Sequence, residues 1–363
     1  MMDFSHIVGN DDIKGFLQCM VTGERIGHSL LFAGRDGIGK GLFAMTLATE
    51  LLGGEAQRQR IEQGRHPDVH VYRPEGKLAM HSIDTMRSFS DEIYLPPNEA
   101  PYKVFIVHDA DRMLPTSANA LLKTFEEPAP RTLIILLSGS PQAILPTVLS
   151  RCRKLYFQPI PSNLIATFLQ SHHSCSSDDA QRIAAQASGS IGRALRLMQQ
   201  QGDPKREVVL DILAKGKMAT YGQLSQAVEG LHNDFEKLKE ELAASCTGEM
   251  APGGFDDLTA VQRDALQKEI DGAVTLRVRE EIDALLEVLL AWYRDIELLH
   301  CGGNTELLTH PDRLEALHHA LQTGFMRPVE QVQKAIADAR INIARSSSIR
   351  STLESLFLKL DLV

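Results

Sequence analysis

Short, continuous runs of apolar residues alternate with helical patterns in the first part of the chain. Three such runs, rich in β-branched side chains and flanked by turn residues, predict strands at 29–33, 103–107 and 132–138. Amphipathic patterns predict helices from about Leu42 to Leu52 and over 117–127. Strands that are apolar throughout are typical of a parallel sheet covered by helices on both faces. We therefore predict an α/β domain over residues 1–160.

After residue 160 the patterns are helical only. Residues 161–204 predict a small helical domain, with Ser176 as an N-cap and Gly189 between two helices. Residues 205–363 predict a second all-helical domain with a Gly- and Pro-rich loop at Thr247–Asp257. One long helix of this domain carries an apolar stripe, which suits core packing, a coiled coil or a partner groove: Ile282, Leu285, Leu286, Leu289, Tyr293 and Ile296.

Composition and charge describe an ordinary soluble protein of two to three domains. Of the 363 residues, 43% are apolar and 23% charged, and the net charge is −9. Residues 1–160 are nearly neutral, with 17 basic and 18 acidic side chains, whereas residues 161–363 hold 21 basic and 29 acidic ones. A surface that coats DNA by general positive charge is therefore not expected.

Cysteine usage and hydropathy indicate a cytoplasmic protein. The chain has 5 cysteines, an odd number, scattered without a Cys-x-x-Cys pair, which is typical of free thiols in a reducing compartment. The first residues show no basic segment followed by an apolar one, so we predict no signal peptide. The chain also lacks an apolar stretch of about 18 residues, so we predict no membrane span.

A nearly complete phosphate-binding loop, G-x-x-x-x-G-K-G, occupies residues 34–41. In such a loop Gly34, Gly37 and Gly39 would let backbone N–H groups curve around a phosphate, and Lys40 would neutralise its charge. At the eighth position, where a Ser or Thr hydroxyl binds Mg²⁺, the chain has Gly41.

The residues after the second predicted strand depart from an ATPase site in the same way. His108 stands where a magnesium-associated Asp is expected, and Asp109 takes the next position, where an acidic residue activates water. Both magnesium contacts are therefore altered. The pattern favours a degenerate nucleotide site, and an ATPase with unusual ligands remains the alternative.

Several motifs occur in a recognisable order along the chain: His66–Val69, Arg73–Gly76, Lys103–Asp109, Asn119–Pro128 and Leu149–Cys152. Together they resemble the clamp-loader branch of the AAA+ ATPases, most closely the delta-prime subunits of bacterial DNA polymerase III, and Gly189–Leu195 extends the resemblance. The resemblance implies an AAA+ P-loop domain with a parallel sheet at 1–160, a helical lid domain at 161–204 and a helical collar or oligomerisation domain at 205–363.

The resemblance also implies roles for individual residues. Arg151, in Ser-Arg-Cys, would be an arginine finger acting in trans on the ATP of a neighbouring subunit. Arg193 matches the second sensor arginine, which would contact nucleotide or pair with a carboxylate. Ser140 lies near the position of the first sensor. A degenerate nucleotide site would comprise Gly34, Gly37, Gly39, Lys40, Asp109 and Arg193. Relatives carry four zinc-binding cysteines where this chain has none, so neither zinc nor another metal is expected.

The function implied is that of a non-motor subunit of the bacterial replicative clamp loader. It would assemble with the gamma/tau ATPase subunits and the delta subunit, and act on the sliding clamp and, through the assembled complex, on primed DNA. A competent ATPase site in this chain is not expected, and weak ATP binding is left open. The alternatives are an active clamp-loader ATPase resembling gamma/tau and an AAA+ adaptor outside replication.

Overall fold

Two units make up the chain in the computed structural model. The first unit comprises residues 1–201 together with 264–273, and the second comprises 202–263 and 274–363. Within these limits the structure describes residue 4 and residues 6–23, 26–127, 129–199, 204–250, 259–322, 327–345 and 347–362. The predicted boundaries at residues 160 and 204 remain predictions.

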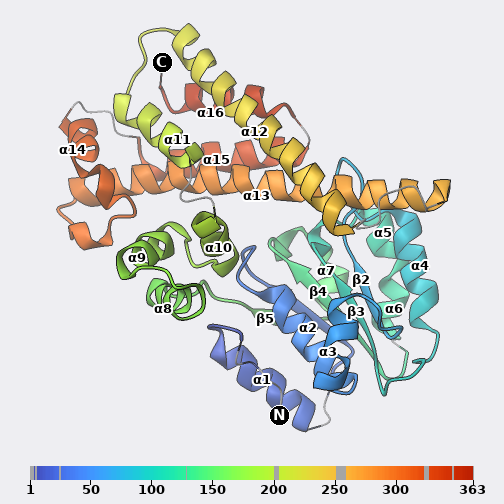
Figure 1. The fold of residues 1–363 in the computed structure, drawn as a ribbon. Coiled ribbons are helices and arrows are strands. Elements are labelled where there is room, and N and C mark those ends of the chain that lie inside the picture. The colour runs from blue at the N-terminus through green and yellow to red at the C-terminus, as the bar shows by residue number, and fades with distance from the viewer. Residues whose placement is uncertain are drawn as a thin grey trace. The chain divides into compact units, whose positions relative to one another are not determined.

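The first unit is built on a parallel sheet of five strands (Figure 1). The strands are β1 (Ser29–Ala33), β2 (Val69–Tyr72), β3 (Lys103–Val107), β4 (Thr132–Ser138) and β5 (Arg153–Tyr156), and their spatial order is β2-β3-β4-β1-β5. All pairs are parallel. The predicted α/β class is confirmed, and the three predicted strands are β1, β3 and β4. The edge strand β5 was not predicted.

Alternate side chains of the central strands enter two separate apolar clusters. Leu30 and Phe32 of β1 belong to one cluster, and Leu31 and Ala33 belong to the other. The first cluster includes side chains of α1 (Asp11–Thr22), α2 (Lys40–Leu51) and α3 (Glu55–Glu62). The second includes side chains of α4 (Ile83–Ile93), α6 (Leu122–Glu126) and α7 (Pro146–Leu149), and α5 (Pro115–Ala120) packs against α4. Helices thus cover both faces, as the continuous apolar strands predict.

Three further helices of the first unit share an apolar cluster of their own. They are α8 (Ser162–His173), α9 (Ser177–Gln186) and α10 (Ile191–Gln199). Ser176 caps α9, because its side chain accepts a hydrogen bond from the backbone N–H of Asp179. Gly189 lies between α9 and α10 with a φ of 82°, a left-handed conformation that favours glycine. Both features match the sequence prediction.

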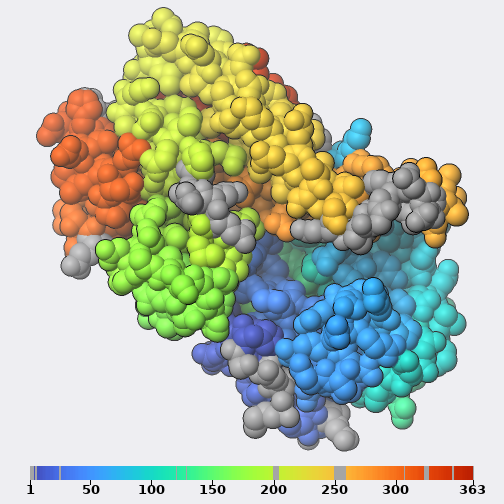
Figure 2. Space-filling model, in the orientation of Figure 1, coloured from blue at the N-terminus to red at the C-terminus, as the bar shows by residue number. Residues whose placement is uncertain are grey.

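The second unit contains helices only among its described residues. These are α11 (Pro204–Lys215), α12 (Tyr221–Met250), most of α13 (Ala260–His300), α14 (Leu314–Gln322), α15 (Val329–Ala344) and α16 (Ile349–Lys359), with 3₁₀ turns at Thr305–Leu307 and Pro311–Arg313. One side of α12 is buried through Leu224, Val228, Leu231 and Phe235, and Figure 2 shows its other side, in yellow, on the surface.

The predicted apolar stripe of α13 belongs to the core of the second unit. Its six side chains are between 0% and 3% exposed in the isolated chain. Core packing, one of the three interpretations open from the sequence, therefore accounts for the stripe.

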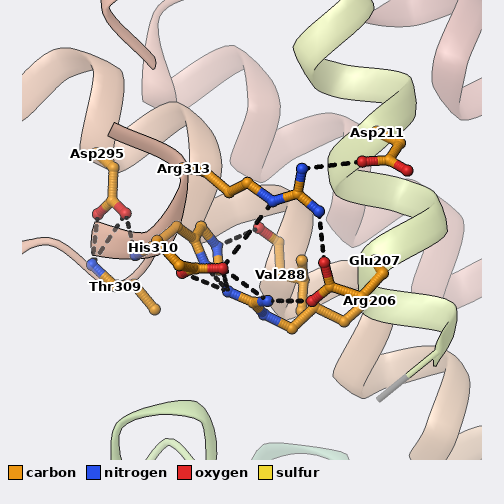
Figure 3. A network of polar contacts seen from close by, with 9 residues as sticks. Arg206, Glu207, Asp211, Val288, Asp295, Thr309, His310 and Arg313 are labelled. Carbon is orange, nitrogen blue, oxygen red and sulfur yellow. Dashed lines mark hydrogen bonds and ion pairs between the residues drawn. The ribbon is translucent and has the colours of Figure 1, made fainter. Parts of the chain in front are cut away.

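A network of charged and polar side chains joins α11, α13 and the turn before α14 (Figure 3). Arg206 of α11 is 3% exposed and donates to Asp312 Oδ1 over 3.0 Å and to His310 Nδ1 over 3.0 Å. Since arginine only donates, His310 Nδ1 is the acceptor, and Nε2–H donates to the carbonyl of Val288. Burial, followed by the charge of Arg206, lowers the pKa of His310, so the ring stays neutral.

The predicted loop at 247–257 is only partly described. Its first residues, Thr247–Met250, are the last residues of α12, so the loop prediction is wrong for them. The remainder of the predicted loop, like Pro128 of the Asn119–Pro128 motif, lies outside the described residues. In the described parts of the chain, helices long enough to cross a bilayer are not apolar enough to do so.

Candidate functional site

The phosphate-loop residues lie at the carboxyl edge of the sheet, where β1 ends and α2 begins. Gly39 is the N-cap of α2 with a φ of 99°, and Gly37 has a φ of 73°. Both conformations favour glycine, so the loop follows the course that its glycines predict. Ligands of open parallel sheets bind at this edge.

Lys40 is turned back onto the loop that precedes it. Its Nζ donates to the carbonyl oxygens of Gly34 and Arg35, the latter over 2.9 Å, and lies 3.2 Å from Asp36 Oδ1. The side chain is 8% exposed. The ammonium group that would neutralise a phosphate is thus satisfied by groups of the chain itself.

His108 occupies the space beside Gly41 where magnesium ligands would be needed. A Cβ atom added to Gly41 would lie 3.6 Å from His108 Cε1. Burial, then the charges of Arg73, His81 and Lys40, lower the pKa of His108 to about 3. The imidazole is therefore neutral at pH 7. An uncharged ring thus stands where an ATPase of this class has the carboxylate of an Asp. Magnesium prefers oxygen ligands, so these two residues do not fit a magnesium nucleotide.

Asp109, the predicted acidic residue of the site, is held in an unfavourable environment. Its φ of 47° is left-handed, which is uncommon for a residue with a side chain. Burial, followed by the negative charges of Asp36 and Asp111, raises its pKa to about 7. Asp111 in turn accepts a hydrogen bond of 2.5 Å from Ser138 Oγ at the end of β4.

The start of α10 contacts the phosphate loop directly. The backbone N–H of Gly192 donates to the carbonyl of Gly37 over 3.0 Å, and a Cβ atom on Gly37 would lie 2.2 Å from Ser190 Oγ. Arg193, half-buried, follows at once, and its N–H donates to Ser190 Oγ over 3.1 Å. The structure therefore brings Arg193 to the same edge of the sheet as the loop. Whether Arg193 has a sensor role remains a prediction.

Arg151 lies at the opposite edge of the sheet. It precedes β5, whose first residue, Arg153, pairs with Leu30 near the start of β1, whereas the phosphate loop follows the end of β1. Five strand residues at about 3.3 Å each separate the two edges. Arg151 is thus not part of the chain's own phosphate site.

The guanidinium of Arg151 is held at the surface by two elements. Its Nη1 donates to the carbonyl of Thr147 in α7 over 2.8 Å, and its Nη2 lies 2.5 Å from Glu126 Oε1 at the end of α6. About one third of the Arg151 side chain is exposed.

Two residues that sequence reasoning did not single out contact the predicted ones. Glu126 pairs with Arg151, and His81 Nε2 donates to the carbonyl of His108 over 2.7 Å. Glu126 lies inside the Asn119–Pro128 motif, so the sequence could have identified it as a candidate. His81 lies in no motif, and its contact depends on the tertiary fold.

The His66–Val69 motif has a structural explanation. The carboxylate of Asp68 is fully buried and accepts hydrogen bonds from the backbone N–H groups of Asn98, Glu99 and Ala100 over 2.6–2.9 Å. Burial alone would raise the pKa of Asp68, but these hydrogen bonds outweigh burial and lower it. Asp68 therefore organises the turn that leads into β3.

Comparisons with known proteins agree with the motifs. A family described as "DNA polymerase III, delta subunit" matches residues 9–161. The DNA polymerase III subunit delta' of Escherichia coli (strain K12) is 28% identical over 325 residues, 83% of this chain and 92% of that protein. The chain is thus similar to the delta' subunits of DNA polymerase III.

Two further relatives show how the similarity is distributed. The delta' subunit of Bacillus subtilis (strain 168) is 37% identical over 151 residues, which cover 39% of this chain and 45% of that protein. The chain thus spans less than half the length of this relative. The DNA polymerase III subunit tau of E. coli is 28% identical over 212 residues, 54% of this chain and 32% of that protein. The family model matches the part of the chain that holds the sheet.

Proposed function

We propose that this chain is a non-motor subunit of the bacterial replicative clamp loader. In this function it assembles in the cytoplasm with ATPase subunits of the gamma/tau type and with a delta subunit. The complex places a sliding clamp on primed DNA, and Arg151 serves the ATP site of a neighbouring subunit.

The observation that carries the proposal is the separation of Arg151 from the chain's own phosphate loop. Arg151 precedes β5 at one edge of the sheet, while Lys40 and Asp109 lie at the other edge. An arginine placed in this way serves no phosphate in its own loop. Its charge and its unused N–H groups are available to a phosphate on another subunit, where a guanidinium stabilises the charge that develops during phosphoryl transfer.

The state of the chain's own site supports a non-motor role. Gly41 supplies no hydroxyl, His108 is neutral, and Lys40 is bound to carbonyl groups of its own loop. The chain therefore lacks the oxygen ligands that position magnesium in an ATPase of this class. This argues against the alternative of an active ATPase resembling gamma/tau.

Substitution of Arg151 tests the proposal in the reconstituted complex. We expect Arg151→Ala to lower the rate of ATP hydrolysis stimulated by clamp and DNA by at least about tenfold, while the subunits still co-elute in size-exclusion chromatography. Lys154→Ala, an exposed cation on the adjoining strand, is the matched control and should leave turnover unchanged. Unchanged turnover in Arg151→Ala would refute the role in trans.

A further inference from the structure

We propose that Glu126 is a positioning residue for Arg151, holding its guanidinium ready for the phosphate of a neighbouring subunit. The inference rests on the proposed function of Arg151 and extends it to a second residue of this chain. Its basis is the hydrogen bond between Glu126, at the end of α6, and Arg151, which follows α7. The two residues are 25 positions apart in the sequence.

Contacts on two sides fix the guanidinium but leave part of it unused. The carbonyl of Thr147 accepts from Nη1 over 2.8 Å, and Glu126 Oε1 accepts from Nη2 over 2.5 Å. A longer contact of 3.4 Å joins Nη1 to Ser150 Oγ. A guanidinium has five N–H donors in a rigid plane, so these contacts leave two donors for an acceptor from outside the chain.

The backbones that carry Glu126 and Arg151 are anchored in the same apolar cluster. Phe125, directly before Glu126, is 5% exposed, and Cys152, directly after Arg151, is 8% exposed, and both belong to the cluster on one face of the sheet. Val148 of α7 belongs to it as well. Burial raises the pKa of the Cys152 thiol to about 12, so the cysteine acts as an apolar anchor and not as a thiolate. Both charged side chains therefore project from fixed positions.

Stability alone does not explain this ion pair. One third of Arg151 and one half of Glu126 are exposed, and ion pairs that are this exposed contribute little to folding stability. The pair does restrict a long side chain that would otherwise sample many rotamers. Because the ion pair already orders the arginine, less side-chain entropy is lost when it binds a phosphate. This raises the rate of phosphoryl transfer, which depends on the orientation of the guanidinium.

The neutral variant Glu126→Gln tests the inference in the reconstituted complex. We expect it to lower kcat for stimulated ATP hydrolysis about fivefold with little change in KM for ATP, because the transition state depends on orientation of the arginine. Glu126→Asp keeps the charge and should restore most of the rate. Glu127→Gln, the exposed neighbour, is the matched control and should leave kcat unchanged. In an Arg151→Ala background, Glu126→Gln should have no further effect.

The outcomes separate the two proposals. An unchanged or higher kcat in Glu126→Gln, with a strong loss in Arg151→Ala, would overturn the positioning role and leave the finger in place. An equal loss in Glu127→Gln would also overturn it, because the effect would then follow the local charge. A lack of effect in Arg151→Ala would refute the proposed function itself.

Discussion

His108 Cε1 lies 3.6 Å from the point where a Cβ atom on Gly41 would stand. The two departures from an ATPase pattern are therefore neighbours in space, although 67 positions separate them in the sequence. A Cβ atom at position 41 would be in ordinary van der Waals contact with the imidazole, so the two positions face the same space. The two missing magnesium ligands therefore fall at one place in the site.

Restoring both ligands should restore nucleotide binding that depends on magnesium. We expect the double variant Gly41→Thr/His108→Asp to bind labelled ATP more tightly with Mg²⁺ than without it, because it regains a hydroxyl and a carboxylate as oxygen ligands. Gly41→Thr alone should not, since position 108 would still lack a carboxylate. Equilibrium titration of the purified chain measures this, and equally tight magnesium-dependent binding by the unaltered chain would contradict the account.

Asp109 should make the first unit less stable as the pH rises. Its folded pKa of about 7 lies above the usual 3.8, so between about pH 4 and 7 the folded chain holds a proton that the unfolded chain loses. Folding stability therefore falls across this range and stays lowered above pH 7.

The neutral variant Asp109→Asn checks this dependence. We expect its free energy of unfolding to exceed that of the unaltered chain by up to about 4 kcal/mol at pH 8, with a difference that becomes small near pH 4. Urea unfolding followed by circular dichroism at both pH values measures the difference. Both chains contain His108, so its contribution to the pH dependence cancels in the difference between their free energies of unfolding. A gain that is equal at pH 4 and pH 8 would show that Asp109 is not responsible.

Gly272 lies inside a helix, but we do not expect alanine at this position to increase the stability of the protein. It lies in the part of α13 that belongs to the first unit, where a Cβ atom would stand 2.3 Å from the carbonyl oxygen of Pro74. Nearby, the N–H of Gly76 donates to the carbonyl of Lys268 over 2.7 Å. We expect Gly272→Ala to lower the free energy of unfolding by about 1–3 kcal/mol, because backbone must move to make room.

A second helical glycine provides the control. Gly230 in α12 has open space at the Cβ position, so Gly230→Ala should raise the stability by up to about 1 kcal/mol through helix propensity. Thermal unfolding of the two variants compares them directly. A stabilising Gly272→Ala would contradict the close approach to Pro74.

Arg206 should be the most sensitive member of the network in the second unit. Arg206→Ala leaves the buried ring of His310 and the carboxylate of Asp312 without their shared donor, and we expect a loss of about 2–3 kcal/mol. Arg313, which is 27% exposed, pairs with Asp211 and Glu207, and Arg313→Ala should cost less than about 1 kcal/mol. Urea unfolding measures both losses, and equal costs would show that burial of Arg206 is unimportant.

The sequence was informative wherever burial was complete. The central strands are continuous apolar runs such as Lys103–Val107 and Thr132–Ser138, and the buried stripe of α13 repeats at helical spacing. The edge strands lack such a signal: Arg153–Tyr156 has exposed positions because one of its edges has no neighbouring strand. The spatial order of strands was likewise not predicted, since it depends on contacts between distant segments.

The sequence likewise predicted only part of the candidate site. Spacing and residue type were enough to select Lys40 and Asp109 as candidates, whereas Arg151 was selected through the family resemblance. The return of Lys40 to its own loop, the contact of Gly37 with Gly192 and the pairing of Arg151 with Glu126 are tertiary contacts. A sequence motif identifies the residue types, whereas the tertiary contacts determine which groups each side chain can bind.

We propose that this chain acts on ATP held by another subunit and not on ATP in its own phosphate loop. The rate of clamp- and DNA-stimulated ATP hydrolysis in complexes carrying either Lys40→Ala or Arg151→Ala tests it most directly. We expect Lys40→Ala to leave the rate nearly unchanged and Arg151→Ala to lower it at least about tenfold. A large loss in Lys40→Ala together with a normal rate in Arg151→Ala would contradict it.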